Sequence, residues 1–247
     1  WAGVEFMFSF DWDNFNADSI FNAMGFCFFS LSVGAGTLIV YASYLSEETD
    51  LPQSTAWVAF LGILAALLGG LMVMPPVFAF GLEPTAGPGL TFVTMPAVFG
   101  QMPFGQLFAV LFYICLIVAA ITSSVSIFEA VTAALADLKF SRRNAVPVAF
   151  IAVMLIGIFC TLSFGELADF KLFGKTIFDL LDYLTSNIGM PLTALGLAIV
   201  AAWVNWPETR HQLTTTKPLS PWILNAIRFG IGIVSPVVIV IVVMRSL

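Results

Sequence analysis

The chain has 247 residues, of which 60% are hydrophobic and 10% charged, with a formal net charge of −6 and a mean hydropathy of +1.00. Soluble domains are about 45–50% apolar and about 25% charged, so this composition excludes a disordered chain and an ordinary water-soluble enzyme domain. The acidic balance offers no basic surface for nucleic acid. The three cysteines all lie in apolar runs, and their odd number indicates no disulfide framework. The composition is typical of an all-α, multi-pass membrane protein.

Six apolar segments are each long enough to cross a bilayer, for which a helix needs about 20 mostly apolar residues. Exposed backbone polar groups are costly in lipid, so we expect all six to be helices. None of them shows the apolar-polar alternation of a β-barrel strand. The segments lie near residues 20–45, 55–81, 104–137, 146–165, 176–204 and 222–244.

The basic residues predict the orientation of these spans, because cytoplasmic loops are enriched in Lys and Arg. The loops at 138–145 and 205–221 carry five of the nine Lys and Arg residues and are expected in the cytoplasm, which places both termini outside. Residues 1–18 resemble an extracellular loop, and the chain begins at Trp1 without a signal-peptide pattern. We therefore expect a fragment of a longer protein whose earlier spans are missing.

The first span is interrupted by polar and small residues at mid-depth. The segment Ser30-Leu31-Ser32-Val33-Gly34-Ala35-Gly36 contains two serines and two glycines. Glycine lowers the cost of leaving the helix, and hydroxyl groups can cap the freed ends. Unwound backbone at that depth is tolerated where it faces protein or a ligand cavity. The segment is either a discontinuous helix that binds a small polar solute or a close helix contact through small residues.

The third span carries three consecutive hydroxyl side chains, Thr122, Ser123 and Ser124, at mid-membrane. Oxygen ligands suit a hard cation such as sodium, by analogy with calcium and magnesium. The alternative is hydrogen bonding between helices.

Charged residues inside the spans are functional candidates because they are costly in lipid. Glu129 lies about two turns beyond the hydroxyl cluster and can accept hydrogen bonds or titrate. Asp137 closes the same helix at its C-terminal end, where it opposes the helix dipole and is expected to have a cationic partner. Asp179 and Asp182 lie near the outer end of the fifth span, and Arg228 is expected to snorkel toward the cytoplasmic end of the sixth.

The connection between the second and third spans is long, rich in Gly and Pro, and unusually apolar. Connections of this length without structure of their own are uncommon, so residues 82–103 are predicted to form a structured extracellular lid. The alternative is a passive loop.

Four motifs, in this order, resemble the second half of a bacterial neurotransmitter:sodium symporter. They are SLSVGAG followed by YASY, the GLEPTAGPGLTF loop with MPAVF, AAITSSVSIFEAV with SRRNAV, and FDLLDYLTSN. Members of this family have inverted repeats and broken helices. The resemblance implies that the six spans are transmembrane helices six to eleven. Residues 19–205 would then be the second five-helix repeat, 206–221 a cytoplasmic loop and 222–247 a further helix. The missing N-terminal half of the protein would be its partner.

The resemblance also implies a set of site residues. Ser30 would lie at a sodium site shared with the substrate carboxylate, while Ala119 by its carbonyl and Thr122 and Ser123 by their hydroxyls would form half of a second sodium site. Asp182 would pair outside with an arginine of the missing first helix. Asp137 and Tyr44 would help to close the cytoplasmic gate. The substrate pocket would be lined by Phe29, Ser32, Gly34, Ala35, Gly36, Ser123 and Ile127.

Three departures from the family pattern refine this reading. Gly62 stands where an amide or acid normally binds the first sodium, so that site is weakened and coupling by the second sodium is favoured. Ala66 stands where relatives place a serine for chloride or a carboxylate, so chloride dependence is not supported. Ala35 stands where the leucine-selective relative has phenylalanine, which opens apolar volume and predicts a large apolar or aromatic substrate.

The function implied is sodium-coupled symport of a neutral amino acid across the bacterial cytoplasmic (inner) membrane, driven in part by the membrane potential. Two alternatives remain: half of another secondary transporter, of the major facilitator or a proton-coupled type, and a non-transporting scaffold or channel subunit. An enzyme is not expected, because the sequence contains no HExxH or GxSxG motif.

Overall fold

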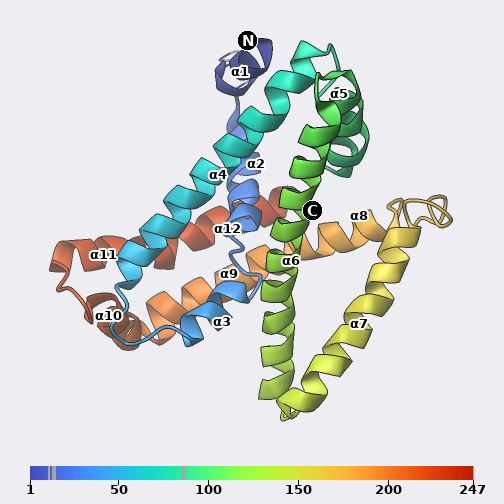
Figure 1. Cartoon of the computed structure of the whole chain (residues 1–247). Helices are drawn as coiled ribbons and strands as arrows, with labels where there is room; N and C mark the ends of the chain where they lie inside the picture. The colour runs from blue at the N-terminus through green and yellow to red at the C-terminus, as the bar shows by residue number, and fades with distance from the viewer. Residues whose placement is uncertain (11, 13–14, 85–86, 247) are drawn as a thin grey trace. The chain divides into compact units, whose positions relative to one another are not determined.

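A computed structural model describes residues 1–10, 12, 15–84 and 87–246 of the chain. These residues form helices and connecting segments, with one isolated antiparallel bridge between Leu172 and Lys175 (Figure 1). Among the described residues, five helical segments are long and apolar enough to cross a membrane. They are Leu51–Ala79, Gly105–Asp137, Arg142–Leu162, Ile177–Val204 and Pro221–Arg245. The first predicted span is instead a pair of shorter helices, α2 (Ala17–Ser30) and α3 (Thr37–Ser43).

The chain divides into two compact units. One contains Trp1–Phe15 and Trp57–Ser124, and the other contains Asn16–Ala56 and Val125–Leu247. The first unit is built from α1 (Ala2–Phe8), most of α4 (Leu51–Ala79), the π-helical turn η1 (Leu90–Thr94), α5 (Met95–Gln101) and the N-terminal part of α6 (Gly105–Asp137).

The core of the first unit lies where α4, η1 and α5 meet. Val77, Met95 and Val98 are fully buried there, and Phe99 packs edge-on against Tyr113 of α6 at 6.3 Å between ring centres. The Tyr113 hydroxyl donates a hydrogen bond to the carbonyl oxygen of Thr91 at 2.8 Å. The described part of 82–103 is therefore folded onto its own apolar core, as a structured connection requires.

Residues 1–18 were expected to be a loop, but they contain the helix α1. Its apolar residues pack on the end of α4, with the rings of Phe6 and Phe78 at 4.9 Å. A Cβ at Gly3 would collide with the backbone at Pro75, so the absence of a side chain permits this close approach. The expected cytoplasmic loop 206–221 likewise contains a helix, α10 (Trp206–Thr214), with a proline at its start and Glu208 in its first turn.

The second unit contains α2, α3, the C-terminal part of α6, and all later elements. Its long helix α12 (Ser235–Ser246) lies along α9 (Met190–Ile199), and α2 contacts both (Figure 1). Buried alanines of α9 and its continuation allow this close packing. The remaining elements are α7 (Arg142–Leu162), α8 (Ile177–Asp182), η2 (Tyr183–Gly189), η3 (Val200–Val204), α11 (Pro221–Phe229) and η4 (Gly230–Val234).

Each of these π-helical turns ends shortly before a proline. Pro96, Pro191 and Pro236 follow the last residue of η1, η2 and η4 by two positions, and Pro207 follows η3 by three. Proline lacks an N–H group and its ring clashes with the carbonyl of the preceding turn. A widened turn just before the ring relieves that clash, which explains where the long helices depart from α geometry.

Candidate functional site

The interruption of the first span lies between Ser30, the last residue of α2, and Thr37, the first of α3. Within it, Ser32, Gly34 and Gly36 have φ angles of 51°, 86° and 82°, in the left-handed region. Glycine tolerates this region, whereas a serine there carries strain that its surroundings must hold. Four of the predicted site residues, Ser32, Gly34, Ala35 and Gly36, therefore lie in this irregular segment, and Phe29 and Ser30 form the end of α2 that precedes it.

This segment touches α9 through Gly34. A Cβ placed on Gly34 would overlap the carbonyl oxygen of Met190, the first residue of α9. A Cβ placed on Gly36 would lie 3.7 Å from the Cβ of Ala130, which is an ordinary van der Waals contact. Gly34 is therefore required both by its φ angle and by a close backbone approach, and Gly36 by its φ angle alone.

The hydroxyl cluster predicted on the third span lies along α6. The Thr122 hydroxyl donates to the carbonyl oxygen of Ala119 at 2.9 Å, and the Ser124 hydroxyl donates to Ala120 at 2.7 Å. The two oxygens of Ala119 and Thr122 are therefore neighbours that one cation could contact together. Ser123 and Ile127 are one helical turn apart, so they share another face of α6. Residues up to Ser124 belong to the first unit, and Ile127 belongs to the second.

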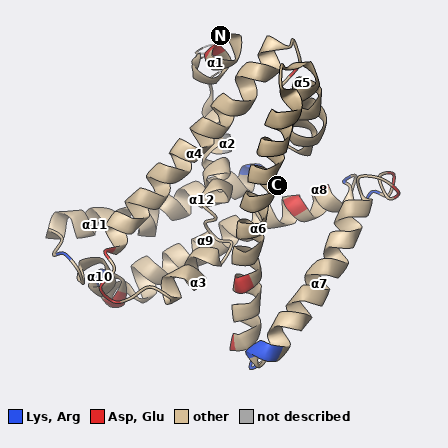
Figure 2. Cartoon of the chain, viewed as in Figure 1, with Lys and Arg blue, Asp and Glu red and all other residues tan. Residues whose placement is uncertain are grey.

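A polar network joins α3, α6 and α7 in the second unit. The Tyr44 hydroxyl donates to Glu129 at 2.7 Å, and a guanidinium nitrogen of Arg142 lies 2.9 and 3.0 Å from the two Glu129 oxygens. The Tyr41 and Ser126 hydroxyls are also hydrogen-bonded. The acidic end of α6 beside the basic start of α7 is visible in Figure 2.

This network contains Tyr44, which the resemblance implied for the cytoplasmic gate together with Asp137. The Tyr44 hydroxyl bonds to Glu129. Within the described part of the chain, the Asp137 side chain forms no hydrogen bond or ion pair, so its expected cationic partner is not among those residues. Arg142 was missed as a partner of Glu129. Its position in the sequence could have indicated this contact, because Arg142 begins α7 and a short connection brings the start of α7 back beside α6.

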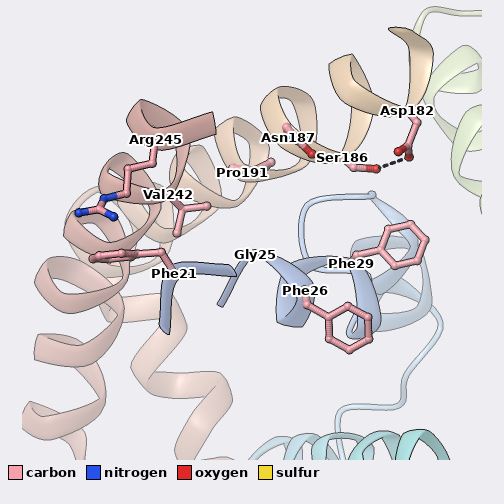
Figure 3. Close-up of a pocket in the computed structure, with 10 residues that line it drawn as sticks. All are labelled: Phe21, Gly25, Phe26, Phe29, Asp182, Ser186, Asn187, Pro191, Val242 and Arg245. Atoms are coloured by element: carbon pink, nitrogen blue, oxygen red, sulfur yellow. Dashed lines mark hydrogen bonds between the residues drawn. The ribbon is translucent and has the colours of Figure 1, made fainter. Parts of the chain in front are cut away.

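A cavity of about 740 Å³ lies between α2, the α8–η2 segment and α12 (Figure 3). Phe21, Phe26 and Phe29 line it from α2, and Asp182 faces it from the opposite side. The Asp182 carboxylate accepts a hydrogen bond from the Ser186 hydroxyl at 2.9 Å. The cavity is of the size that binds small molecules, and its wall combines three phenylalanines with one acidic group, Asp182, and one basic group, Arg245.

The start of α4 is tied to the segment after α10. Lys217 lies 3.0 Å from Asp50 and donates to the Gln53 side chain at 3.3 Å. Asp50 also caps α4 by accepting the Gln53 backbone N–H at 3.0 Å. The Gln53 N–H and the Lys217 ammonium hold the pKa of Asp50 below its usual value.

This link predicts a specific pH dependence. Because the pKa of Asp50 is lowered in the folded protein, its contribution to stability is present at neutral pH and is lost as the pH falls below about 4. We expect Asp50→Asn to lower the Tm slightly at pH 7, and the difference from the unsubstituted protein to shrink as the pH falls below about 4. Thermal unfolding between pH 7 and 3 measures this, with the neighbouring exposed Glu47→Gln as control. A Tm difference that persists unchanged at pH 3 would contradict the expectation.

The comparisons with known proteins agree with this architecture. The family described as the Sodium:neurotransmitter symporter family matches residues 1–247. The uncharacterized sodium-dependent transporter YhdH of Bacillus subtilis is 38% identical over 198 residues, covering 80% of this chain and 44% of the relative. An uncharacterized sodium-dependent transporter of Haemophilus influenzae is 36% identical over 217 residues, covering 87% of this chain and 48% of the relative.

Among solved structures, the crystal structure of MhsT in complex with L-phenylalanine matches with a TM-score of 0.88 and 32% sequence identity. The match covers 100% of this chain and 56% of that one. The chain spans about half the length of the curated relatives it matches. Its helices, the family match and this likeness together show a multi-pass membrane protein from a family of transporters and not of enzymes. The chain belongs to the sodium:neurotransmitter symporter family.

Proposed function

We propose that the protein of which this chain is part carries out sodium-coupled symport of a neutral, large apolar or aromatic amino acid across the bacterial cytoplasmic membrane. The observation that supports it most is the interrupted helix α2–α3, in a chain whose family and relatives are named for sodium-dependent transport. An interruption at mid-span presents backbone groups that a polar solute can bind.

In this proposal, sodium is bound by neutral oxygens. The Ala119 carbonyl and the Thr122 hydroxyl, 2.9 Å apart, form one side of the cation site together with Ser123. Ser30 lies beside the substrate carboxylate and a first sodium, whose binding is weak or absent because Gly62 offers no side-chain oxygen. Chloride has no role at Ala66. These assignments use hard oxygen ligands for a hard cation.

The substrate is proposed to lie along the interrupted segment, with Ser32 to Gly36 around it and Ser123 and Ile127 facing it from α6. The related structure of MhsT holds L-phenylalanine. The small side chain of Ala35 would also leave apolar volume for the ring of an aromatic amino acid. Asp182 is proposed to act in the outer gate, and Tyr44 with Asp137 in the inner gate.

Equilibrium binding to the full-length protein that carries this chain tests the proposal. We expect purified protein to bind tritiated L-phenylalanine in NaCl and not in choline chloride. Unlabelled L-tryptophan and L-leucine should compete, whereas L-glutamate and L-lysine should not. Equal binding in both salts would overturn the sodium dependence, and competition by L-glutamate alone would overturn the substrate class.

The role of Ala35 gives a prediction about substrate size. The substitution Ala35→Phe would fill the apolar volume proposed to hold an aromatic side chain, and overpacking costs about 1–3 kcal/mol. We expect the affinity for L-phenylalanine to fall about 5- to 100-fold while that for L-alanine is retained. The ratio of the two dissociation constants in one preparation is the readout, because misfolding would lower both. An unchanged ratio would contradict the placement of Ala35.

A further inference from the structure

A groove in the second unit lies outside the proposed transport site. Two widened turns, η3 and η4, form it together with α11, and it has a volume of about 240 Å³. The Trp203 indole N–H donates to the carbonyl oxygen of Gly232 at 3.0 Å and fixes the two turns to each other. We call this the Arg228 groove; its lining residues are Ala202, Trp203, Asn225, Arg228, Phe229, Gly232 and Ile233.

Arg228 is the cation of this mostly apolar groove. It lies seven residues after Pro221, the first residue of α11, so its Cα is about 10 Å along the helix from that end. Helical side chains lean toward the N-terminus, which here is the end expected at the cytoplasmic surface. The guanidinium carbon accordingly lies 5.1 Å from the ring centre of Trp206 at the start of α10.

The charge of Arg228 is not neutralised within the described part of the chain. Its Nε donates to the carbonyl oxygen of Ala202 at 3.1 Å, and the ion pairs formed among the described residues involve other cations. A guanidinium has five N–H donors in a fixed fork, so its terminal nitrogens remain available to an anion. A cation inside a membrane-spanning helix is costly unless it is paired.

The surroundings of Arg228 favour a phospholipid as the source of that anion. A phosphate matches the guanidinium fork, which binds it through two parallel hydrogen bonds. Phe229 and Ile233 continue the groove along the span, and they are 57% and 45% exposed, which leaves surface for an acyl chain. Trp203 and Trp222 are 63% and 78% exposed, in the manner of tryptophans at a membrane interface.

We propose that the Arg228 groove binds an anionic phospholipid, with its phosphate on the Arg228 guanidinium and one acyl chain along Phe229 and Ile233. Basic pockets between membrane helices on the cytoplasmic side are suited to such headgroups. The positive charge at this groove is a local feature, because the chain as a whole carries a net charge of −6.

Native mass spectrometry and thermal unfolding of the delipidated full-length protein test this. We expect added phosphatidylglycerol to bind and to raise the Tm, and phosphatidylcholine to do so at least tenfold more weakly. The Arg228→Gln variant should lose this difference, since its amide can still donate to Ala202 but carries no charge. Arg228→Lys should retain part of it. The control Arg143→Gln removes the same charge from the start of α7, which is expected on the same side of the membrane, and should behave like the unsubstituted protein.

Three outcomes would overturn the proposal. Equal binding of phosphatidylglycerol to the unsubstituted and Arg228→Gln proteins would place the lipid elsewhere. Equal stabilisation by glycerol phosphate would show that a free phosphate, without an acyl chain, fills the site. No effect of any phosphate compound on the unsubstituted protein would show that the Arg228 groove does not bind a phosphate. If Arg228→Gln fails to fold, the lipid comparison on the unsubstituted and Arg228→Lys proteins still decides.

Discussion

Replacing Gly34 with alanine is expected to destabilise the protein by about 2–5 kcal/mol and to abolish substrate binding. A residue with a Cβ in the left-handed region costs about 1–2 kcal/mol. In addition, the new Cβ would overlap the carbonyl oxygen of Met190, so either the interrupted segment or the start of α9 must move. The Tm of the full-length protein and its sodium-dependent binding of tritiated L-phenylalanine measure the two effects.

Gly36→Ala is the matched control, because Gly36 has nearly the same φ angle but room for a methyl group beside Ala130. Gly36→Ala should destabilise the protein by only about 1–2 kcal/mol, the cost of placing a residue with a Cβ in the left-handed region. Equal losses in the two variants would show that the approach of Gly34 to α9 does not matter, and that only the left-handed backbone does.

Removing the Thr122 hydroxyl is expected to weaken sodium binding about 10- to 100-fold. Thr122→Val keeps the size of the side chain but deletes an oxygen that we propose as a sodium ligand, and a hydrogen bond or ligand to a charged group contributes about 1.5–3 kcal/mol. The sodium concentration that gives half-maximal binding of L-phenylalanine is the measurement.

The neighbouring Ser124→Ala serves as control for Thr122→Val. The Ser124 hydroxyl likewise bonds to a backbone carbonyl, that of Ala120, but it has no place in the proposed cation site. We expect its sodium dependence to be unchanged within about twofold, as for a substitution away from the site. A sodium dependence that shifts equally in both variants, or in neither, would remove Thr122 from the site.

The long helices could be predicted from sequence because the apolar run needed to cross a bilayer is itself the signal. The segments predicted at 104–137 and 176–204 begin within one residue of the observed 105 and 177. The helix predicted from 146 begins earlier, at Arg142, because a helix continues into the polar interface where an apolar run has already ended. The family assignment is confirmed, since it rests on ordered motifs that the family match covers in full.

Side-chain partners and local helix distortions were harder to predict from the sequence than the long helices. The serines and glycines of 30–36 indicated either an interrupted helix or a close helix contact, and the structure separates α2 and α3 there. Nothing in the spacing of Glu129 indicated that Tyr44 and Arg142 both reach it, because that depends on how three helices pack. The prolines that follow the π-helical turns were visible in the sequence. A proline alone, however, does not distinguish a kink, a helix start and a widened turn.

Uptake into proteoliposomes that contain the full-length protein tests the central claim, the coupling of sodium to an amino acid, most directly. The account predicts that an inward sodium gradient drives accumulation of L-phenylalanine above its external concentration. It also predicts that collapsing the gradient with a sodium ionophore releases the accumulated substrate. Accumulation that continues when potassium replaces sodium on both sides, or that follows a proton gradient instead, would contradict it.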